Sequence, residues 1–377
     1  MSRNCIFHIP NKLDKNGKSG SQIRPRKMKR ALEEIGYEVD EIQGSGHERK
    51  EAIRRIKGKI REGIHYDFLY SESSTMPTLL TEKHHMPTYP FLDFGFFKFC
   101  KKHGIPIGLF YRDVYWKFDV YAKSVPLYQR LFSIPMYKYD LKKYDQLLDI
   151  LYLPSLRMKT LLSECRMICT KALPPGAVFS NELVEKKQDY YLKRRKDDKI
   201  KLFYVGGVSG LYDIGMILKT ICERDDIEII VCCKENEWNN EKERYKNYLT
   251  DNVKVVHVTG EGLEKYYLWA DICCCYFEAS GYRDMAVPIK LFEYIGHITP
   301  IIATDGTEAG RMVEQADIGW TIPYREQDFT ALLDHIISHP KELFEKHINM
   351  LECLKQNTWE QRAWQVKDDL TGQGKHK

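Results

Sequence analysis

The 377-residue chain has no apolar run approaching the roughly 18 to 20 residues that a helix needs to cross a bilayer. Its first ten residues lead into an apparent strand, without the apolar core of a secretory signal. The eleven cysteines include no C-x-x-C pair, and Cys165 and Cys169, four apart, have no second ligand pair nearby. Five others lie in apolar, strand-like runs: Cys232, Cys233, Cys273, Cys274 and Cys275. These absences predict a cytoplasmic protein with reduced core cysteines and no metal.

Two phosphate-binding signatures are missing from the Gly- and Lys-rich segment 11–27, which follows the first predicted strand. The segment has neither the G-x-x-x-x-G-K-[ST] spacing of a P-loop nor the G-x-G-x-x-G spacing of a dinucleotide site. Its position after a strand still suits a ligand, because open α/β sheets bind ligands at the carboxyl ends of their strands. The segment therefore predicts a generic ligand loop.

Charge is divided unequally along the chain. Residues 1–172 contain 31 Lys and Arg against 19 Asp and Glu, whereas the remainder contains 27 against 34. The first part is thus +12 and the second −7. A basic half predicts an anionic partner such as a phospholipid surface, a diphosphate-linked acceptor or a nucleic acid.

Apolar runs alternate with helical patterns in both halves of the sequence. The predicted strands are 5–9, 39–42, 66–70, 105–111, 150–153 and 167–170 in the first half, and 201–205, 227–232, 253–256, 272–276 and 298–303 in the second. The segments 22–35, 48–61, 91–103 and 155–165 are predicted helices. This alternation predicts an α/β protein with two doubly wound parallel sheets. We expect domains at 1–172 and 173–352, followed by a segment at 353–377 whose helix has one apolar face.

The clearest chemical signal is the short helix predicted from Pro288 to Gly296. Lys290 and Glu293 are three residues apart, which places them on one face within its first two turns. A helix N-terminus and a lysine together suit a phosphate, and a carboxylate one turn deeper can accept hydrogen bonds from two sugar hydroxyls. The alternative is an ordinary amphipathic helix with two solvated charges.

Two parts of the basic half carry further hypotheses. Arg112 and Asp113 follow the strand 105–111, where they could bind an acceptor or transfer a proton; an Arg–Asp ion pair that fixes the loop is the alternative. The helix 48–64 has an isoleucine stripe surrounded by basic residues, among which we place Arg49, and 115–144 interleaves aromatic residues with lysines. Both segments could lie on a membrane, whereas a solvated basic face and stacking on single-stranded nucleic acid are alternatives.

Four stretches resemble one family. They are Val287-Pro288-Ile289-Lys290-Leu291-Phe292-Glu293-Tyr294, Leu268-Trp269-Ala270-Asp271-Ile272, Asp317-Ile318-Gly319-Trp320-Thr321-Ile322-Pro323 and Gly20-Ser21-Gln22-Ile23-Arg24-Pro25. With two doubly wound halves, they resemble the GT-B fold retaining glycosyltransferases that include bacterial capsule and O-antigen enzymes. The resemblance implies two Rossmann-like domains facing a central cleft, with the last helix crossing back to the first domain.

The resemblance also implies roles for individual residues. Lys290 would bind the diphosphate of a nucleotide-sugar and Glu293 the ribose, and both are candidate catalytic residues with Arg112 and Asp113. Other donor contacts would come from Gly206, Gly207, Ser209, Lys234, Gly260, Leu291 and Gly306. Acceptor contacts would come from Gly20, Ser21, Arg24 and Glu72. No cofactor or metal is implied, and nucleic acid is not an expected partner.

The sequence departs from the family pattern at one informative position. The family has a second glutamate eight residues before the ribose-binding one, but Met285 stands there and Asp284 precedes it. This departure leaves the donor sugar open. The resemblance still implies transfer of a sugar to a glycan or lipid-linked acceptor, by a cytoplasmic protein on the inner face of the plasma membrane. A sugar-nucleotide epimerase and a non-catalytic partner subunit are the alternatives.

Overall fold

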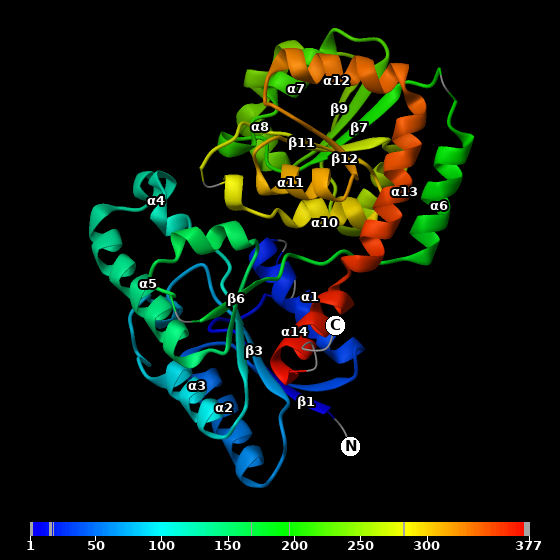
Figure 1. Ribbon diagram of the computed structural model, residues 1–377. Helices are drawn as coiled ribbons and strands as arrows, with labels where there is room; N and C mark the ends of the chain where they lie inside the picture. The colour runs from blue at the N-terminus through cyan, green and yellow to red at the C-terminus, as the bar shows by residue number, and fades with distance from the viewer. Residues whose placement is uncertain are drawn as a thin grey trace. The chain divides into compact units, whose positions relative to one another are not determined.

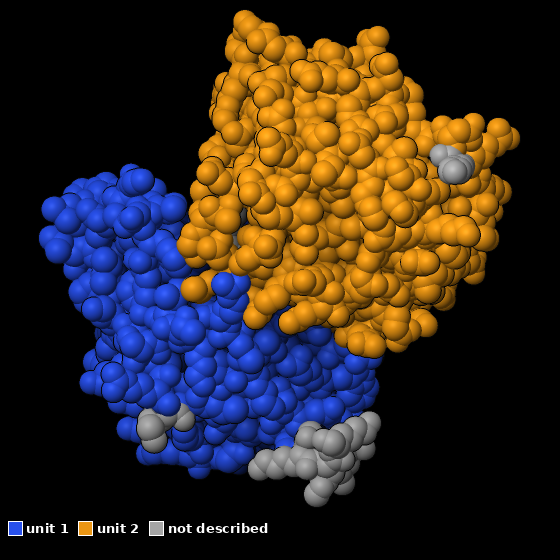
Figure 2. Space-filling model, turned by 45° about the horizontal axis from the view of Figure 1, so that its top comes forward, with its two compact units in different colours: residues 1–176, 359–377 blue, residues 177–358 orange. Residues whose placement is uncertain are grey.

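The computed structural model describes residues 3–14, 17, 19–166, 168–195, 197–281 and 283–372. The chain divides into two compact units, which Figure 2 colours separately. Unit 1 comprises Met1–Gly176 and Trp359–Lys377, and unit 2 comprises Ala177–Thr358. The boundary expected at 352/353 falls inside helix α13 (Pro340–Gln356), so unit 2 extends six residues further.

Unit 1 is built on six parallel strands in the order β2-β1-β3-β4-β5-β6. The strands are β1 (Arg3–His8), β2 (Tyr37–Ile42), β3 (Phe68–Glu72), β4 (Ile107–Phe110), β5 (Ile150–Leu153) and β6 (Cys169–Ala172). The prediction that β6 starts at Met167 falls outside the described residues, as do positions 15, 16 and 18 of the predicted ligand loop. The alternation of strand and helix in this half is confirmed.

Helices cover both faces of this sheet. One face packs against α2 (Gly46–Arg61), α3 (Leu92–Lys102) and α5 (Leu127–Leu147), and the other against α1 (Gly20–Glu34) and α14 (Trp359–Thr371). In Figure 1, α14 lies beside α1, although the two helices are more than 300 residues apart in the sequence. Trp359, Ala363 and Val366 recur at helical spacing and are buried in this core, so the last helix is an integral part of unit 1.

Unit 2 repeats the design with the order β12-β11-β10-β7-β8-β9, again all parallel. Its strands are β7 (Ile200–Val205), β8 (Ile227–Cys232), β9 (Val253–Val256), β10 (Ile272–Cys275), β11 (Ile301–Thr304) and β12 (Gly319–Ile322). The helices α7 (Gly215–Cys222), α8 (Glu235–Tyr245) and α12 (Glu326–Ser338) contribute to the core on one face. On the other lie α9 (Glu264–Trp269), α10 (Ile289–Gly296), α11 (Glu308–Gln315) and α13, with α6 (Asn181–Lys193).

Two segments differ from the prediction. The predicted helix 155–165 is a 3-10 helix over Leu156–Leu161. The strand expected from Ile298 starts at Ile301, because Ile298 takes a φ of 43° to turn the chain from α10 into the sheet. A positive φ is unfavourable for a β-branched residue, and here a fully buried side chain holds it.

The segment 268–272 has a structural function. The ammonium of buried Lys187 donates to the carbonyls of Tyr267, at 2.7 Å, and Ala270, which caps the end of α9. Asp271 is fully buried and accepts from Arg194 at 2.8 Å and from the Lys201 N–H at 2.8 Å. These bonds tie α6 and α9 to the sheet.

The cysteines of the second sheet are free thiols in the core, as predicted. Among the described residues, no helix combines the length and apolarity that spanning a bilayer requires. The same part of the chain shows no group of three His, Cys, Asp or Glu side chains arranged to hold a metal.

A buried carboxyl group makes the stability of unit 1 depend on pH. One oxygen of Asp140 accepts the Thr78 N–H at 2.7 Å, and the other has no hydrogen-bond partner among the described residues. Burial raises the pKa of Asp140 to about 7, against the opposing bond from Thr78. The folded pKa lies above the unfolded one, so stability is lost as the pH rises from about 4 to about 7.

Asp140→Asn should remove this dependence, because an amide keeps an acceptor for Thr78 and cannot ionise. We expect the melting temperature of the variant, relative to the wild type, to be higher at pH 8 than at pH 4.5. Exposed Asp119→Asn serves as the control. A difference between Asp140→Asn and the wild type that does not change with pH would show that this carboxyl group ionises normally.

Candidate functional site

The strand order of unit 2 reverses between β7 and β10. From β7 the chain moves outward through β8 and β9, and from β10 it moves the other way through β11 and β12. Doubly wound sheets bind ligands at the carboxyl ends of the strands at such a reversal, where the two flanking loops separate. The loop 206–210, which we call the glycine loop, follows β7, and the segment 276–288 leads from β10 to α10.

Lys290 extends from the first turn of α10 to this loop. A β-carbon built on Gly206 would lie 2.5 Å from Lys290 Nζ and 2.1 Å from the Tyr204 hydroxyl, so a larger residue there would displace these groups. The ammonium also lies 5.6 Å from the centroid of the Tyr204 ring. Burial lowers the pKa of Lys290, and the nearby Glu293 carboxylate opposes that shift. The glycine loop thus receives a partly desolvated positive charge.

Glu293 lies one turn along α10. The Tyr267 hydroxyl donates to Glu293 Oε2 at 3.4 Å, and the Tyr267 ring stacks on His297 with 3.8 Å between centroids. His297 Nδ1 donates to the Glu293 carbonyl at 2.7 Å, which fixes the ring that supports Tyr267. Burial raises the pKa of Cys275, the last residue of β10, to about 12, with Lys290 lowering and Glu293 raising it. Both charges therefore act at the end of the same strand.

The glycine loop is bound by a residue of α8. The Glu237 carboxylate accepts the Val208 N–H at 2.9 Å and the Ser209 hydroxyl at 2.7 Å. A β-carbon on Gly207 would lie 3.0 Å from the same oxygen. Burial lowers the pKa of Lys290, and Glu237 is among the charges that oppose this shift.

The other predicted donor residues occupy loops at the same edge of the sheet. Lys234 is exposed at the N-cap of α8, after β8. Gly260 and Gly306 follow β9 and β11 with φ values of 63° and 77°, which favour glycine. Leu291 is fully buried, so only its backbone could contact a ligand, and its N–H already bonds the Pro288 carbonyl at 3.1 Å.

Four predicted residues come together at the carboxyl edge of unit 1. Glu72, fully buried at the end of β3, pairs with Arg24 at 3.4 Å and with Arg112 at 3.2 Å. Arg112 Nη1 also donates to the Gly20 carbonyl at 3.4 Å. Burial lowers the pKa of Arg112, and Glu72 opposes the shift. Arg24 is a buried member of this cluster, and its guanidinium lies 3.5 Å from the centroid of the Phe110 ring.

Two predicted residues lie beside this cluster with partners of their own. The Ser21 hydroxyl bonds that of Ser19 at 2.9 Å. Asp113 accepts the Tyr115 N–H at 2.8 Å, which starts the 3-10 helix Tyr115–Lys117. The ion pair that Arg112 makes is with Glu72, so the loop is held through β3.

A second polar network in unit 1 joins residues of β1, β3 and α3. His8 Nδ1 lies 2.8 Å from the Ser71 hydroxyl, and His8 Nε2 lies 2.9 Å from Asp93. Ser71, His8 and Asp93 are at most 3% exposed, so this Ser-His-Asp arrangement offers no nucleophile to a substrate. It is part of the packing of unit 1.

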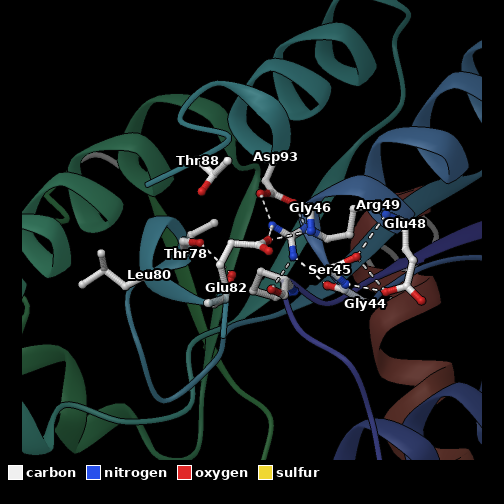
Figure 3. Close-up of polar contacts among 12 residues, drawn as sticks. Gly44, Ser45, Gly46, Glu48, Arg49, Thr78, Leu80, Glu82, Thr88 and Asp93 are labelled. Carbon is white, nitrogen blue, oxygen red and sulfur yellow. Dashed lines mark hydrogen bonds and ion pairs between the residues drawn. The ribbon is translucent and has the colours of Figure 1, made fainter. Parts of the chain in front are cut away.

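Arg49 completes that network (Figure 3). Its guanidinium donates to Asp93 at 3.0 Å and 3.3 Å and to the Gly44 carbonyl at 2.7 Å, and it lies 3.7 Å from Glu82. The Glu82 carboxylate also accepts the Gly46 N–H at 2.6 Å. Arg49 is 2% exposed, so its assignment to the solvated basic face of helix 48–64 is wrong.

A separate cavity of about 410 Å³ lies at the other edge of the first sheet. It is lined near the amino ends of β1 and β4 by Arg3, Pro106 and Gly104, and from α14 by Lys367. None of the predicted site residues lines it.

Three residues at the unit 2 site escaped the sequence analysis: Tyr204, Tyr267 and Glu237. The two tyrosines lie in apolar segments and resemble ordinary core residues. Glu237 lies in the first turn of a charged helix, where glutamate is common for its effect on the helix dipole alone. Their roles depend on contacts between distant segments.

No protein-family model matches the sequence, and no curated protein matches it. Solved structures match nearly the whole chain. Sucrose-phosphate synthase from Thermosynechococcus elongatus is 14% identical, with a TM-score of 0.61 and 97% of each chain covered. HepE from Anabaena, in complex with UDP, is 13% identical, with a TM-score of 0.62 over 98% of this chain and 100% of that chain. A trehalose-6-phosphate synthase is 12% identical, with a TM-score of 0.59 over 97% and 99% of the two chains. The chain therefore has the GT-B fold of these glycosyltransferase structures, as its sequence predicted.

Proposed function

We propose that the protein is a glycosyltransferase that moves a sugar from a nucleoside-diphosphate sugar to an acceptor hydroxyl. The observation that carries this proposal is the placement of Lys290 Nζ against Gly206 at the strand reversal of unit 2. The fold match supports it, because HepE was solved with UDP and with UDP-glucose. The finer proposal is a retaining enzyme of surface polysaccharide assembly, as the sequence resemblance implies.

In this proposal, separate parts of the protein bind the diphosphate, the ribose and the base of the nucleotide-sugar. Lys290 and the N–H groups of the glycine loop bind the diphosphate, because both present positive charge. Glu293, oriented by Tyr267, accepts hydrogen bonds from the ribose hydroxyls. The base lies toward Lys234 and Gly260.

The chemistry is a substitution at the anomeric carbon of the sugar. The bond from this carbon to the diphosphate oxygen breaks, and a bond to the acceptor oxygen forms on the same face. The acceptor proton moves to the departing phosphate oxygen, so charge and atoms balance. Lys290 and the loop stabilise the negative charge on the leaving diphosphate, and we propose that they do so without a metal. The trehalose-6-phosphate synthase structure, which has the same fold and comes from work on glycosyl transfer with retention, supports a retaining mechanism.

We assign the acceptor to unit 1, near Arg112. The pairing with Glu72 and the Gly20 carbonyl holds this guanidinium at the carboxyl edge, where its side chain is still 12% exposed. Asp113 starts the next turn and fixes the loop around it. Arg24 and Glu72, being buried, position Arg112.

Arg112→Gln should reduce the rate of transfer, because the acceptor loses a positioned donor of hydrogen bonds. Nucleoside diphosphate affinity should stay within about twofold, since effects at separate sites are nearly independent. Steady-state kinetics and isothermal titration calorimetry measure the two quantities, with exposed Arg30→Gln as the control. A parallel loss of nucleotide affinity and melting temperature would make the Arg112 ion pair purely structural.

We also propose that unit 1 binds an anionic membrane, which would bring it to a lipid-linked acceptor. Apolar side chains are exposed on α4 (Asp119–Ser124) and the start of α5: Val120, Leu127, Tyr128, Leu131 and Phe132. Lys123 is exposed beside them, and residues 1–172 carry a charge of +12. In contrast, Trp116 and Tyr137 of the aromatic stretch are stacked in the core.

Helix α2 was predicted to share this membrane face. Figure 1 draws α4 at the opposite end of unit 1 from α2. The membrane proposal therefore rests on α4 and the start of α5 alone. Insertion of their apolar side chains, with roughly 1 kcal/mol from each nearby basic residue, predicts reversible binding that salt weakens.

Leu131→Glu should abolish sedimentation with anionic vesicles, because it places a negative charge in the apolar surface. Leu192→Glu on α6 is the matched control, since Leu131 and Leu192 are 70% and 74% exposed. The assay compares phosphatidylglycerol and phosphatidylcholine vesicles across a salt series, with a single-stranded oligonucleotide as competitor. Equal sedimentation with neutral and anionic vesicles at low salt would exclude this surface as an anionic-lipid site.

One experiment separates the proposed transferase from its two alternatives. The protein is incubated with a panel of nucleoside-diphosphate sugars, with and without a lipid-linked acceptor extract, and nucleoside diphosphate release and product anomers are followed by NMR. We expect release that requires acceptor and a product that keeps the donor's anomeric configuration. Sugar isomerisation without acceptor would identify an epimerase. Absence of both turnover and nucleotide binding would identify a non-catalytic subunit. This alternative is included because Met285 stands where the family has a glutamate.

A further inference from the structure

The glycine loop of unit 2 already has an anionic partner within the chain. A single oxygen of Glu237 accepts the Val208 N–H at 2.9 Å and the Ser209 hydroxyl at 2.7 Å. The same oxygen would lie 3.0 Å from a β-carbon at Gly207, so it sits directly against the small-residue turn. These donors are the ones that a loop of this kind offers to a phosphate.

Glu237 is also electrostatically linked to Lys290. Burial lowers the pKa of Lys290, and the Glu237 charge is among those that oppose this shift, while the Lys290 ammonium lies against Gly206 at the start of the loop. The Glu237 carboxylate therefore occupies hydrogen-bond donors of the loop and offsets part of the positive charge of Lys290 beside it. A phosphate oxygen accepting from Val208 and Ser209 would have to displace it, because two anions cannot share one pair of donors at this distance.

The loop does not depend on Glu237 alone for its shape. The Tyr245 hydroxyl, from the other end of α8, donates to the Val208 carbonyl at 2.6 Å. Tyr245 is fully buried and stacks on Trp238, with 5.8 Å between ring centroids. Because α8 holds the other side of Val208 by this bond, the Glu237 side chain can leave while the loop stays in place.

We propose that Glu237 is an internal competitor for the phosphate-binding donors of the glycine loop. This inference rests on the proposed function and concerns the same donor site. The Glu237 carboxylate lowers the affinity of the protein for free nucleoside diphosphate, and it returns to the glycine loop as that product departs. Glu237 thus acts through its charge on the phosphate part of the site and leaves the nucleoside contacts unchanged.

The test is the affinity of Glu237→Gln for UDP, ADP and GDP, measured by isothermal titration calorimetry on the full chain. Glutamine keeps the size and one oxygen acceptor but removes the negative charge. We expect the nucleoside diphosphate that the wild type prefers to bind about tenfold more tightly to the variant, which corresponds to about 1.4 kcal/mol. The affinity for the corresponding nucleoside should not change.

Glu235→Gln is the matched control, because Glu235 lies in the same first turn of α8 and is exposed. It should bind the nucleoside diphosphate like the wild type. A tighter complex with Glu237→Gln alone supports the proposal. Unchanged or weaker binding by Glu237→Gln, with the nucleoside still bound, overturns it and makes Glu237 a scaffold of the loop.

Failure of the proposed function gives a different result. If the wild type and Glu237→Gln bind none of the three nucleoside diphosphates, both the donor site and the competitor are overturned together. Weak binding by the wild type with tight binding by Glu237→Gln still supports the competitor. The two failures are therefore distinguishable in one titration series.

Discussion

Lys290→Ala is expected to weaken binding of nucleoside diphosphate by roughly ten- to a hundredfold, the scale of one charge-assisted hydrogen bond of about 1.5 to 3 kcal/mol. The reason is the position of the ammonium, which lies against Gly206 and is partly desolvated, so water screens it little. The nucleoside alone should bind nearly as it does to the wild type, because Lys290 would contact only phosphate. Calorimetric titration with the nucleoside and its diphosphate measures both.

Two further variants show whether this effect is local. Glu293→Ala should weaken the nucleoside and the diphosphate alike, because the ribose is common to both ligands. Lys219→Ala removes an exposed lysine of α7 that pairs with Glu326, and it should change neither affinity. If a folded Lys290→Ala, Glu293→Ala double variant binds the diphosphate like the wild type, the donor site lies elsewhere.

Arg49→Met should destabilise unit 1 by about 3 to 5 kcal/mol, the usual cost of removing one partner of a buried ion pair. Methionine fills much of the same space but leaves Asp93 without the two hydrogen bonds from Arg49. The Pro10 and Gly44 carbonyls, bonded at 2.8 Å and 2.7 Å, lose their donor as well. Chemical denaturation followed by circular dichroism gives the free energy of unfolding.

Arg54→Met, on the exposed side of the same helix, is the control and should change stability by less than about 0.5 kcal/mol. The comparison separates a buried network from general loss of positive charge. Similar stabilities of the two variants would mean that Arg49 lies in solvent, as the sequence prediction held. They would also remove the link that Figure 3 shows between α2 and the loop after β3.

Much of the fold follows from local sequence because buried parallel strands are short, continuous apolar runs. The segments 227–232 and 253–256 are predicted with the same bounds as β8 and β9. The segment 155–165 is different. Ser155, Met158, Leu162 and Cys165 are buried at helical spacing, yet the chain forms a 3-10 helix over Leu156–Leu161. The pattern of apolar residues alone does not separate a 3-10 turn from an α-helix here.

The sequence itself contains the signal that Arg49 is buried. Arg49 lies three, four and seven residues before Ala52, Ile53 and Ile56, which places it on the buried stripe of α2. Residue type favoured solvent, but helical position favoured the interior. The partners of Arg49 are the buried Asp93 and the partly buried Glu82, which come from a segment more than 30 residues away.

The aromatic stretch 115–144 divides in a similar way. Tyr137, Leu141 and Tyr144 recur at helical spacing and are buried, whereas Tyr128 and Leu131 lie on the exposed start of α5. Composition alone treats these residues as one feature. The periodicity of the buried positions separates a core stripe from an apolar surface, and only the surface remains available to a membrane.

At the site, the sequence predicts residues that share one element and misses those that approach from another. Lys290 and Glu293 share a helix face, so their proximity follows from spacing. The contact between Glu237 and the loop at Val208 joins segments 29 residues apart. No local pattern encodes such a contact, because it depends on the pairing of β7 with β8.

We expect a nucleotide-sugar to bind at the carboxyl edge of the unit 2 sheet, where the loops that follow β7 and β10 separate. Hydrogen-exchange mass spectrometry with and without the preferred nucleoside-diphosphate sugar tests it most directly. We predict slower exchange in peptides covering 205–212 and 288–296, and loss of this protection in Lys290→Ala. Protection confined to unit 1, for example around the cavity lined by Arg3 and Lys367, would contradict the claim.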